Sequence, residues 1–304
     1  MIIESQALRV KFGHAEALKG IDLHVPEGAV YALLGPNGAG KSTAIRVLMN
    51  VLRQDSGDAT VLGTDTRRLG PRHFQHIGFV SENQRLPGAL SLQAYFAYLS
   101  RLYERWDAAL AGSLCAQFDL PPDRKLKALS HGMRIKALLI GALAFRPKLL
   151  VLDEPFSGLD TVTRDEIVGG LLQQVQDTSV LISSHELSEI ESFTTHVAFL
   201  QDGRLAIEES IESLQARFRE ITATLSGRRT LPSPLPDSWL MPEVQGHRLR
   251  LVHARCTDEA DALRELEQHF GAVRASFEPM SLRAVVGTLI QDGRRRRTGS
   301  DTEV

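Results

Sequence analysis

A glycine-rich segment near the start of the chain constrains the fold more than any other feature. Residues 35–43 read Gly-Pro-Asn-Gly-Ala-Gly-Lys-Ser-Thr, which is the complete pattern GxxxxGK[ST] of a phosphate-binding loop. A short apolar run at 30–34 precedes this loop, and apolar residues follow it at helical spacing as far as Leu52. The segment is therefore predicted to join a buried strand to an amphipathic helix, and it indicates a nucleotide-binding protein.

The residue types in the loop suit a chain of phosphates. Glycines let the backbone curl so that several N–H groups point at phosphate oxygens, and the helix N-terminus adds the positive end of its dipole. Lys41 is expected to reach the β- and γ-phosphates, and the Ser42 hydroxyl is expected to bind Mg²⁺. The predicted nucleotide contacts in this loop are Gly35, Pro36, Asn37, Gly38, Ala39, Gly40, Lys41, Ser42 and Thr43.

A second buried-strand pattern at 149–152 ends in Asp153-Glu154-Pro155. An acidic residue at the C-terminal end of such a strand can hold Mg²⁺ directly or through water, as the Walker B carboxylate does in P-loop ATPases. Asp153 is the candidate for this metal ligand. Glu154 would be free to polarise the water that attacks the γ-phosphate, because phosphoryl transfer needs mainly positioning and charge stabilisation.

Further motifs follow these two in a recognisable order. Residues 129–133 read Leu-Ser-His-Gly-Met, residues 157–160 read Ser-Gly-Leu-Asp, and His185 ends another strand-like run. Together with Phe12 near the start, they are similar to the LSGGQ signature, the D-loop, the switch histidine and the adenine-stacking aromatic of one family. Over residues 1 to about 214 the chain resembles an ATP-binding cassette (ABC) ATPase, the nucleotide-binding subunit of an ABC transporter.

The resemblance implies ATP and Mg²⁺ as cofactors and a head-to-tail dimer with a second ATP-binding subunit, either a copy or a paralogue. Ser130 and the backbone N–H of Gly132 would open an apolar helix and face the γ-phosphate bound by the partner. His185 would donate a hydrogen bond to that phosphate and sense its loss, and Asp160 would belong to the D-loop. The implied catalytic residues are Lys41, Glu154 and His185.

Two positions depart from the family pattern. In the signature, His131 and Met133 replace Gly and Gln, but the Ser hydroxyl and the second Gly are retained, so we expect function to survive. In the Q-loop, alignment through 77–80 puts Glu82 where the family has Gln, and Gln84 is the competing candidate. We favour Glu82 because it needs no gap, and its carboxylate can still bind Mg²⁺ or the attacking water. It also adds a negative charge beside the Walker B acids.

The apolar periodicities predict an α/β fold built on a mostly parallel sheet, with the nucleotide at its C-terminal edge. Strand-like runs lie near the start and at 30–34, 76–80, 149–152 and 179–184. A helical region at about 84–146 corresponds, by resemblance, to the helical subdomain inserted in ABC cassettes. Residues 196–208 are predicted to form a closing hairpin through Asp202-Gly203.

The chain beyond residue 214 is predicted to form a structural region separate from the cassette. Residues 215–290 indicate a small α+β extension, with strand candidates at 220–225 and 248–252 and a helix capped by Asp258. By pattern it is similar to the extension of ABC ATPases from drug, antibiotic and peptide exporters. Residues 291–304 carry a run of arginines and are predicted to be a basic, disordered tail.

Composition agrees with a large globular chain. The 304 residues are 43% hydrophobic and 24% charged, which allows one large domain or two. The formal net charge of −2 gives no electrostatic argument for nucleic acid. Two cysteines without a CxxC pattern are consistent with a reducing cytosol, and neither a signal peptide nor a membrane span is expected. Any membrane role is therefore expected to come from a partner.

Taken together, the motifs predict an ATPase that dimerises around two Mg²⁺-ATP and drives a separate membrane permease, with export favoured over import. The expected location is the cytoplasmic face of the inner or plasma membrane, where residues 84–91 would dock the permease. The alternative is a soluble ATP switch of the same fold acting on a ribosome or nucleic acid. Translation factors with this fold normally carry two cassettes in one chain, and DNA-repair ATPases with this fold carry a long coiled coil in the helical region. This chain has one cassette and no sustained heptads in that region. A generic P-loop kinase would leave the signature, the D-loop and His185 without explanation.

Overall fold

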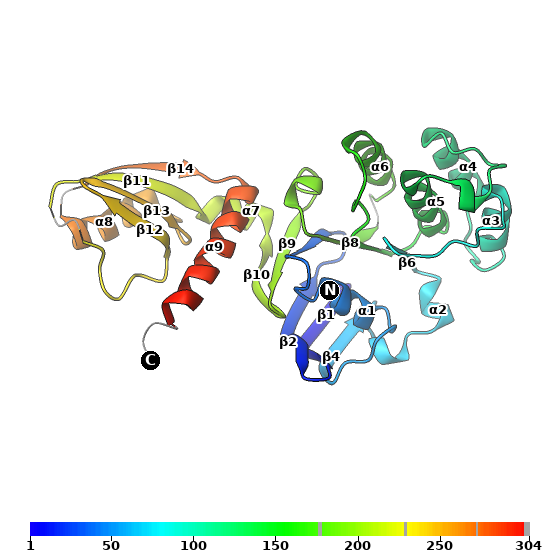
Figure 1. The fold of residues 1–304 in the computed structure, drawn as a ribbon, viewed down its shortest axis with the longest axis horizontal. Helices are drawn as coiled ribbons and strands as arrows, with labels where there is room; N and C mark the ends of the chain where they lie inside the picture. Colours follow the sequence, from blue (N-terminus) through cyan, green and yellow to red (C-terminus); the bar gives the residue numbers. More distant parts are fainter. Residues whose placement is uncertain (176–177, 228–229, 272, 301–304) are drawn as a thin grey trace. The chain divides into compact units, whose positions relative to one another are not determined.

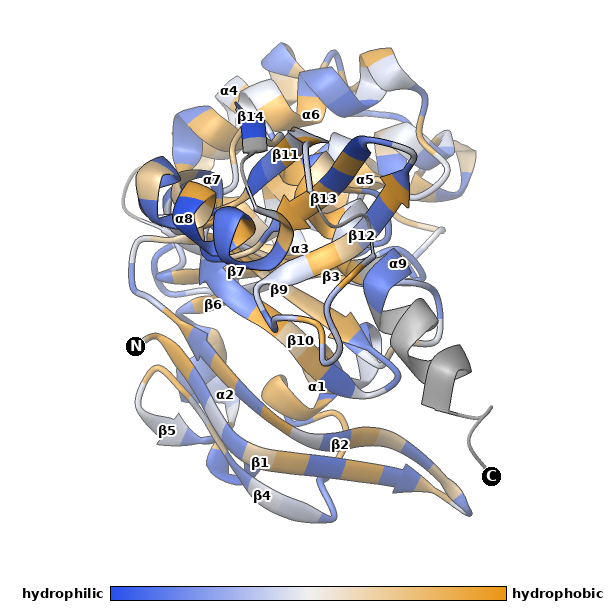
Figure 2. Cartoon of the chain, turned by 90° about the vertical axis from the view of Figure 1, so that its left-hand side faces the viewer, coloured by the Kyte–Doolittle hydropathy of each residue, from blue (hydrophilic) through white to orange (hydrophobic). Residues whose placement is uncertain are grey.

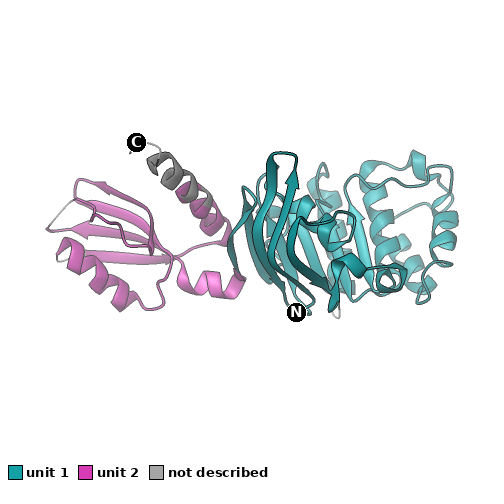
Figure 3. Ribbon diagram, turned by 90° about the horizontal axis from the view of Figure 1, so that it is seen from below, with its two compact units in different colours: residues 1–208 teal, residues 209–304 magenta. Residues whose placement is uncertain are grey.

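In the computed structural model, all residues are described except 176–177, 228–229, 272 and 301–304. The chain divides into two compact units, residues 1–208 and residues 209–304 (Figure 3). The sequence places this boundary near residue 214. The structure puts it earlier, within strand β10 (Arg204–Ser210), because helix α7 (Ile211–Arg217) contacts helix α9 (Leu282–Ser300) of the second unit.

The first unit is built on a central sheet of six strands with the order β10-β9-β3-β8-β7-β6 (Figure 1). All pairings from β9 through β3, β8 and β7 to β6 are parallel, which confirms the predicted sheet. Strands β3, β7 and β8 are buried along their whole length, as expected where helices cover both faces. In addition to β10, the strands of this sheet are β3 (Val30–Leu34), β6 (Ile77–Ser81), β7 (Leu149–Asp153), β8 (Ser179–Ser184) and β9 (His196–Gln201).

A separate antiparallel sheet, which the sequence predicts only at its first strand, also belongs to the first unit. Its order is β2-β1-β4-β5, and alternating hydrophobic and hydrophilic residues mark its two long strands (Figure 2). The apolar face of this sheet packs with helix α1 into the same core as the central sheet. The elements are β1 (Ile3–Phe12), β2 (Ala15–Val25), α1 (Lys41–Leu48), β4 (Ser56–Val61) and β5 (Thr64–Asp65).

Four helices of the first unit, α3 to α6, begin at polar capping residues, whereas α1 and α2 begin at glycines. Side chains of Ser91, Asp107, Ser130 and Asp160 each accept a hydrogen bond from a backbone N–H of the first turn. Three of these helices, α3 to α5, lie within the predicted helical region at 84–146. The helices are α2 (Pro71–Phe74), α3 (Leu92–Leu99), α4 (Ala108–Gln117), α5 (His131–Leu143) and α6 (Thr161–Gln174), with 3₁₀ turns at Thr66–Arg68, Leu126–Ala128 and Leu187–Glu189.

The second unit is an antiparallel sheet with helices, in agreement with the predicted α+β pattern. Its strand order is β12-β13-β11-β14, and the Trp239 ring stacks on Phe270 of helix α8 with 5.8 Å between ring centroids. Asp258 caps that helix as expected. In addition to α7 and α9, the elements of this unit are β11 (Arg219–Leu225), β12 (Trp239–Gln245), β13 (Arg248–His253), α8 (Glu259–Phe270) and β14 (Val273–Pro279).

Helix α9 extends into the range for which the sequence predicts a disordered tail. Residues 291–300 are helical, and residues 301–304 lie outside the described part of the chain. The buried Asp292 carboxylate accepts a hydrogen bond from the Met241 N–H at 3.2 Å, which holds the helix to β12 beyond residue 290. No helix in the described ranges combines the length and apolar character that crossing a membrane requires.

Candidate functional site

The phosphate-binding loop connects β3 to α1 and follows a course that only glycine allows at two points. A Cβ atom on Gly35 would lie 2.2 Å from the Leu200 carbonyl oxygen of β9. Gly40, with a φ of +109°, caps α1, and a Cβ there would lie 2.7 Å from the Ala17 carbonyl oxygen. The loop is therefore pressed against neighbouring strands, while its tip at 36–38 is exposed.

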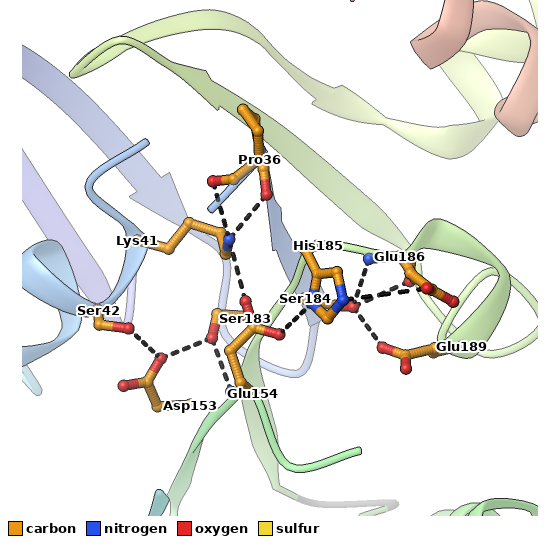
Figure 4. Close-up of polar contacts among 11 residues, drawn as sticks. Pro36, Lys41, Ser42, Asp153, Glu154, Ser183, Ser184, His185, Glu186 and Glu189 are labelled. Carbon is orange, nitrogen blue, oxygen red and sulfur yellow. Dashed lines mark hydrogen bonds and ion pairs between the residues drawn. The ribbon is translucent and has the colours of Figure 1, made fainter. Parts of the chain in front are cut away.

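Lys41 is the first residue of α1, and its side chain turns back into the loop. Its Nζ donates to the carbonyl oxygens of Gly35 at 2.7 Å and Pro36 at 3.3 Å (Figure 4). The side chain is only 5% exposed, and its charge is paired with the Glu154 carboxylate, whose Oε1 lies 3.0 Å from Nζ. The loop thus holds its lysine in place for an anion.

Asp153 ends strand β7 beside this loop and is fixed by two hydroxyl groups. Ser42 donates to Asp153 Oδ1 at 3.0 Å, and Ser183 donates to the same oxygen at 2.8 Å. Ser183 stands directly opposite Asp153 in the β7–β8 register, and its Oγ also accepts the Glu154 N–H at 2.9 Å. No motif singles out Ser183 as a site residue, although its place near the C-terminal end of a buried strand, two residues before His185, could have indicated it.

Glu154 follows in a left-handed backbone conformation with a φ of +51°, which is unusual for a residue with a side chain. Its carboxylate contacts Lys41 through Oε1 and His185 through Oε2, with 2.8 Å to the His185 Nδ1 atom. Burial of the carboxylate opposes ionisation, but the hydrogen bonds from His185 and Lys41 outweigh it, so the pKa of Glu154 is lowered. The group is therefore a carboxylate at neutral pH.

His185 comes directly after β8 and lies on the opposite side of Glu154 from Lys41 (Figure 4). Because a carboxylate only accepts, the Nδ1 atom carries the proton in the contact with Glu154. This hydrogen bond is the main reason that the pKa of His185 is raised above its ordinary value of 6.5. The other ring nitrogen, Nε2, lies 3.9 Å from Glu186 Oε1.

The signature and the D-loop lie beside each other, each at the start of a helix. Ser130 caps α5 by accepting the Met133 N–H at 3.3 Å, and Asp160 caps α6 by accepting the Thr163 N–H at 2.9 Å. The hydrogen bond from the Thr163 backbone is also the main cause of the lowered pKa of Asp160. A Cβ on Gly132 would lie 2.7 Å from the Thr163 methyl carbon, so the two helices pack closely here. Among the described residues, no hydrogen bond or ion pair joins the signature to the phosphate-binding loop of the same chain.

The two Q-loop candidates occupy different surroundings. Glu82 is half-buried, and its N–H donates to the Asp153 carbonyl oxygen at 3.1 Å, which places it beside the Walker B strand. Gln84 is exposed, and its side-chain oxygen accepts the Ser81 N–H at 3.3 Å. Phe12 ends β1, is 52% exposed, and pairs with Ala15 across the hairpin. Its predicted contact with adenine stays a prediction.

The described contacts thus bring together residues from three segments that are far apart in the sequence. A lysine, two carboxylates, two hydroxyl groups and a histidine lie at the C-terminal ends of β3, β7 and β8. Ser42 and Asp153 offer the oxygen ligands that Mg²⁺ prefers, and Lys41 offers the charge that phosphate oxygens require. The arrangement suits the binding and transfer of a phosphoryl group.

Comparison with known proteins agrees with this chemistry. A family model described as "ABC transporter" matches residues 18–157. The chain is 31% identical to the daunorubicin resistance ATP-binding protein DrrA2 of Streptomyces coeruleorubidus, over 99% of this chain and 96% of that protein. It is 32% identical to the sulfate/thiosulfate import ATP-binding protein CysA of Bradyrhizobium diazoefficiens, over 67% of this chain and 62% of that protein.

Among solved structures, the fold is similar to a dimeric, post-hydrolysis form of the ATP-binding cassette MJ0796 bound to ADP and Pi. The TM-score is 0.61 at 23% identity, and the match covers 69% of this chain and 98% of that chain. At 23% identity this similarity supports only the fold, which is the α/β cassette fold that the motifs predict for the first unit.

Proposed function

The chain belongs to the ABC transporter family as an ATP-binding ATPase, and we propose that it dimerises around two Mg²⁺-ATP to drive a separate membrane permease in export. The observation that carries the proposal is the contact of Lys41 and His185 with one carboxylate, Glu154, beside the pair formed by Ser42 and Asp153. These are the groups that hydrolysis of a γ-phosphate requires.

In this proposal the loop and Lys41 bind the phosphates of ATP, while Ser42 and Asp153 hold Mg²⁺ with Glu82 nearby. Their hydroxyl and carboxylate oxygens, 3.0 Å apart, are of the type that would hold this ion. When bound, Mg²⁺ supplies positive charge that neutralises the phosphates. Asp153 needs little rearrangement for this role, because hydroxyl groups on both sides already orient its carboxylate.

Glu154 is proposed to polarise the attacking water. Phosphate oxygens would compete with Glu154 for Lys41, and this competition would free one carboxylate oxygen to accept a hydrogen bond from water. The second oxygen stays on His185 Nδ1, which fixes the carboxylate and leaves Nε2 to approach the γ-phosphate. The lowered pKa of Glu154 supports a hydrogen-bond acceptor at neutral pH.

The signature is proposed to complete the site of a second subunit, which is a copy of this chain or a paralogue. Ser130 and Gly132 lie at the start of the 13-residue helix α5, where backbone N–H groups favour an anion. Ser130→Arg should therefore block turnover and ATP-dependent dimerisation, while ATP binding by the monomer stays close to wild type. Equilibrium binding, gel filtration with ATP and an ATPase assay measure the three quantities. Normal turnover in this variant would contradict the shared site.

The second unit supports export over import. The relative described by daunorubicin resistance matches 99% of the chain, so the match includes this unit. Two other relatives described by daunorubicin resistance match 68% and 70% of the chain, and the relative described by sulfate/thiosulfate import matches 67%. A match to the cassette alone does not distinguish export from import. The proposal of export therefore depends on the match to the second unit.

The permease is proposed to dock on residues 84–91, which begin two residues after Glu82 and are exposed or half-buried. We expect the chain, expressed with its permease, to sediment with membranes at the cytoplasmic face. Arg85→Glu with Leu86→Asp should release it without a large loss of basal ATP hydrolysis, because the phosphate-binding loop is untouched.

A matched control is available in the same subdomain. Arg101→Glu with Leu102→Asp makes the same chemical change on an exposed Arg-Leu pair and should leave sedimentation unchanged. Equal release by both variants would show a general effect of charge. Co-purification with ribosomes or DNA in place of a membrane protein would favour the soluble switch, although nucleic acid is not an expected partner.

A further inference from the structure

We propose that His131, the residue that replaces a glycine in the signature, is a positioning residue that holds the D-loop and the backbone of Glu154 in place. The inference deepens the proposed function and rests on the assignment of Glu154 as the residue that polarises water. It concerns a side chain for which the sequence predicts no role.

The contact itself is specific. The Nε2 atom of His131, the first residue of α5, lies 3.0 Å from the backbone carbonyl oxygen of Ser157, 26 residues further along the chain. A carbonyl oxygen only accepts hydrogen bonds, so the Nε2 atom carries the proton and donates it. A glycine at this position cannot make the contact.

Ser157 connects this hydrogen bond to the candidate catalytic residue. Its N–H lies 3.3 Å from the Glu154 carbonyl oxygen and closes the turn that begins at Glu154. The backbone of Glu154 has a φ of +51°, which costs on the order of 1 kcal/mol or more for a residue with a side chain and needs support from its surroundings. His131 thus holds the far end of the turn that sets the direction of the Glu154 carboxylate.

The imidazole ring also lies beside the D-loop. Gly158 has a φ of +70°, and a Cβ built on it would lie 3.9 Å from His131 Nε2. The ring and the D-loop backbone are therefore neighbours, and the hydrogen bond to Ser157 is the contact that holds them together.

Loss of His131 should act locally, because other contacts hold α5 and α4 against α6. The Lys136 Nζ atom of α5 donates to Glu166 of α6 at 2.5 Å. Phe118, at the C-terminal end of α4, packs against Gly170 of α6 so closely that a Cβ there would lie 2.5 Å from its ring. These contacts are untouched by a change at residue 131. A defect in turnover can therefore be separated from a defect in folding.

The test compares three variants of the full chain. His131→Leu keeps bulk but has no donor, His131→Asn has a donor that is too short to reach the Nε2 position, and His131→Gln places an amide N–H close to it. Loss of one such hydrogen bond is expected to lower kcat about fivefold in the Leu and Asn variants, with KM for ATP changed by less than about twofold. The Gln variant should stay near wild type.

Hydrogen–deuterium exchange supplies a readout that does not depend on turnover. In the Leu and Asn variants, the amides of Ser157 to Asp160 should exchange faster than in wild type, and in the Gln variant they should not. Equal activity of all three variants, a change in KM with kcat unchanged, or unchanged exchange would each overturn the proposal. If the Leu variant does not fold, the Asn variant decides.

Glu154→Gln, measured beside these variants, separates the two levels of inference. If Glu154→Gln hydrolyses ATP normally, the assignment of Glu154 is wrong. If it is inactive while the His131 variants match wild type in rate and exchange, only the positioning role of His131 fails.

Discussion

Replacement of Glu154 by Gln tests the site most directly, because this carboxylate contacts both Lys41 and His185. The change keeps the size and shape of the side chain but removes its negative charge. The amide can still accept one hydrogen bond through its oxygen, so Lys41 or His185 keeps a partner. The fold should therefore tolerate the substitution.

The expected effect on turnover is large. A positioned general base typically contributes about 10²- to 10⁴-fold, so kcat should fall by about that factor, which raises the barrier by about 3–5 kcal/mol. ATP affinity should be retained or increased, because the phosphates no longer compete with a carboxylate for Lys41 Nζ, which Glu154 contacts at 3.0 Å. Because the variant binds ATP without hydrolysing it, it should remain a stable dimer in the presence of ATP.

Steady-state phosphate release measures kcat, and gel filtration with and without ATP measures the dimer. Glu186→Gln is the matched control, because Glu186 is also acidic and lies 3.9 Å from the Nε2 atom of the same histidine. It is exposed and has no described contact with Lys41, so its removal should change kcat by less than about twofold. Hydrolysis by Glu154→Gln within about fivefold of wild type, or equal loss in both variants, would refute the catalytic assignment.

Three further outcomes are expected. Lys41→Ala should abolish high-affinity ATP binding and turnover, since it removes the cation of the phosphate loop; tight binding in a titration would contradict this. Replacing His185 with Gln should lower the melting temperature most in the mildly acidic range below pH 6.5, where Glu154 is still ionised. The pKa of His185 is raised from 6.5, so its contribution to stability is complete below pH 6.5 and is lost as the pH rises through the raised value; a difference that grows with pH would be inconsistent. Gly170→Ala should lower the free energy of unfolding by about 1–3 kcal/mol, because its Cβ would lie 2.5 Å from Phe118. The neighbouring Gly169→Ala, which meets nothing within 4 Å, should raise it by about 0.5–1 kcal/mol in urea unfolding, and the reverse order would refute the packing argument.

Much of the cassette could be predicted from local patterns. Residues 35–43 and the run that ends at Asp153 combine a strand period with residues of strong phosphate or metal chemistry, and both lie where expected. The hairpin at 196–208 and the cap at Asp258 follow from turn and capping preferences over a few residues. The first antiparallel sheet was mostly missed, because it is defined by pairing between distant segments, such as Ile3 with Val61, and because β5 has only two residues.

The sequence by itself determined which residue types stand at the C-terminal ends of the parallel strands, because motif spacing and buried-strand patterns are local properties. Only the tertiary structure decided which of them touch. The pairing of Glu154 with both Lys41 and His185 depends on the register of β7 and β8 and on a left-handed backbone at Glu154. The contact of His131 with Ser157 depends on how closely α5 packs on α6. Both are set by long-range packing, which no period or motif of a single segment encodes.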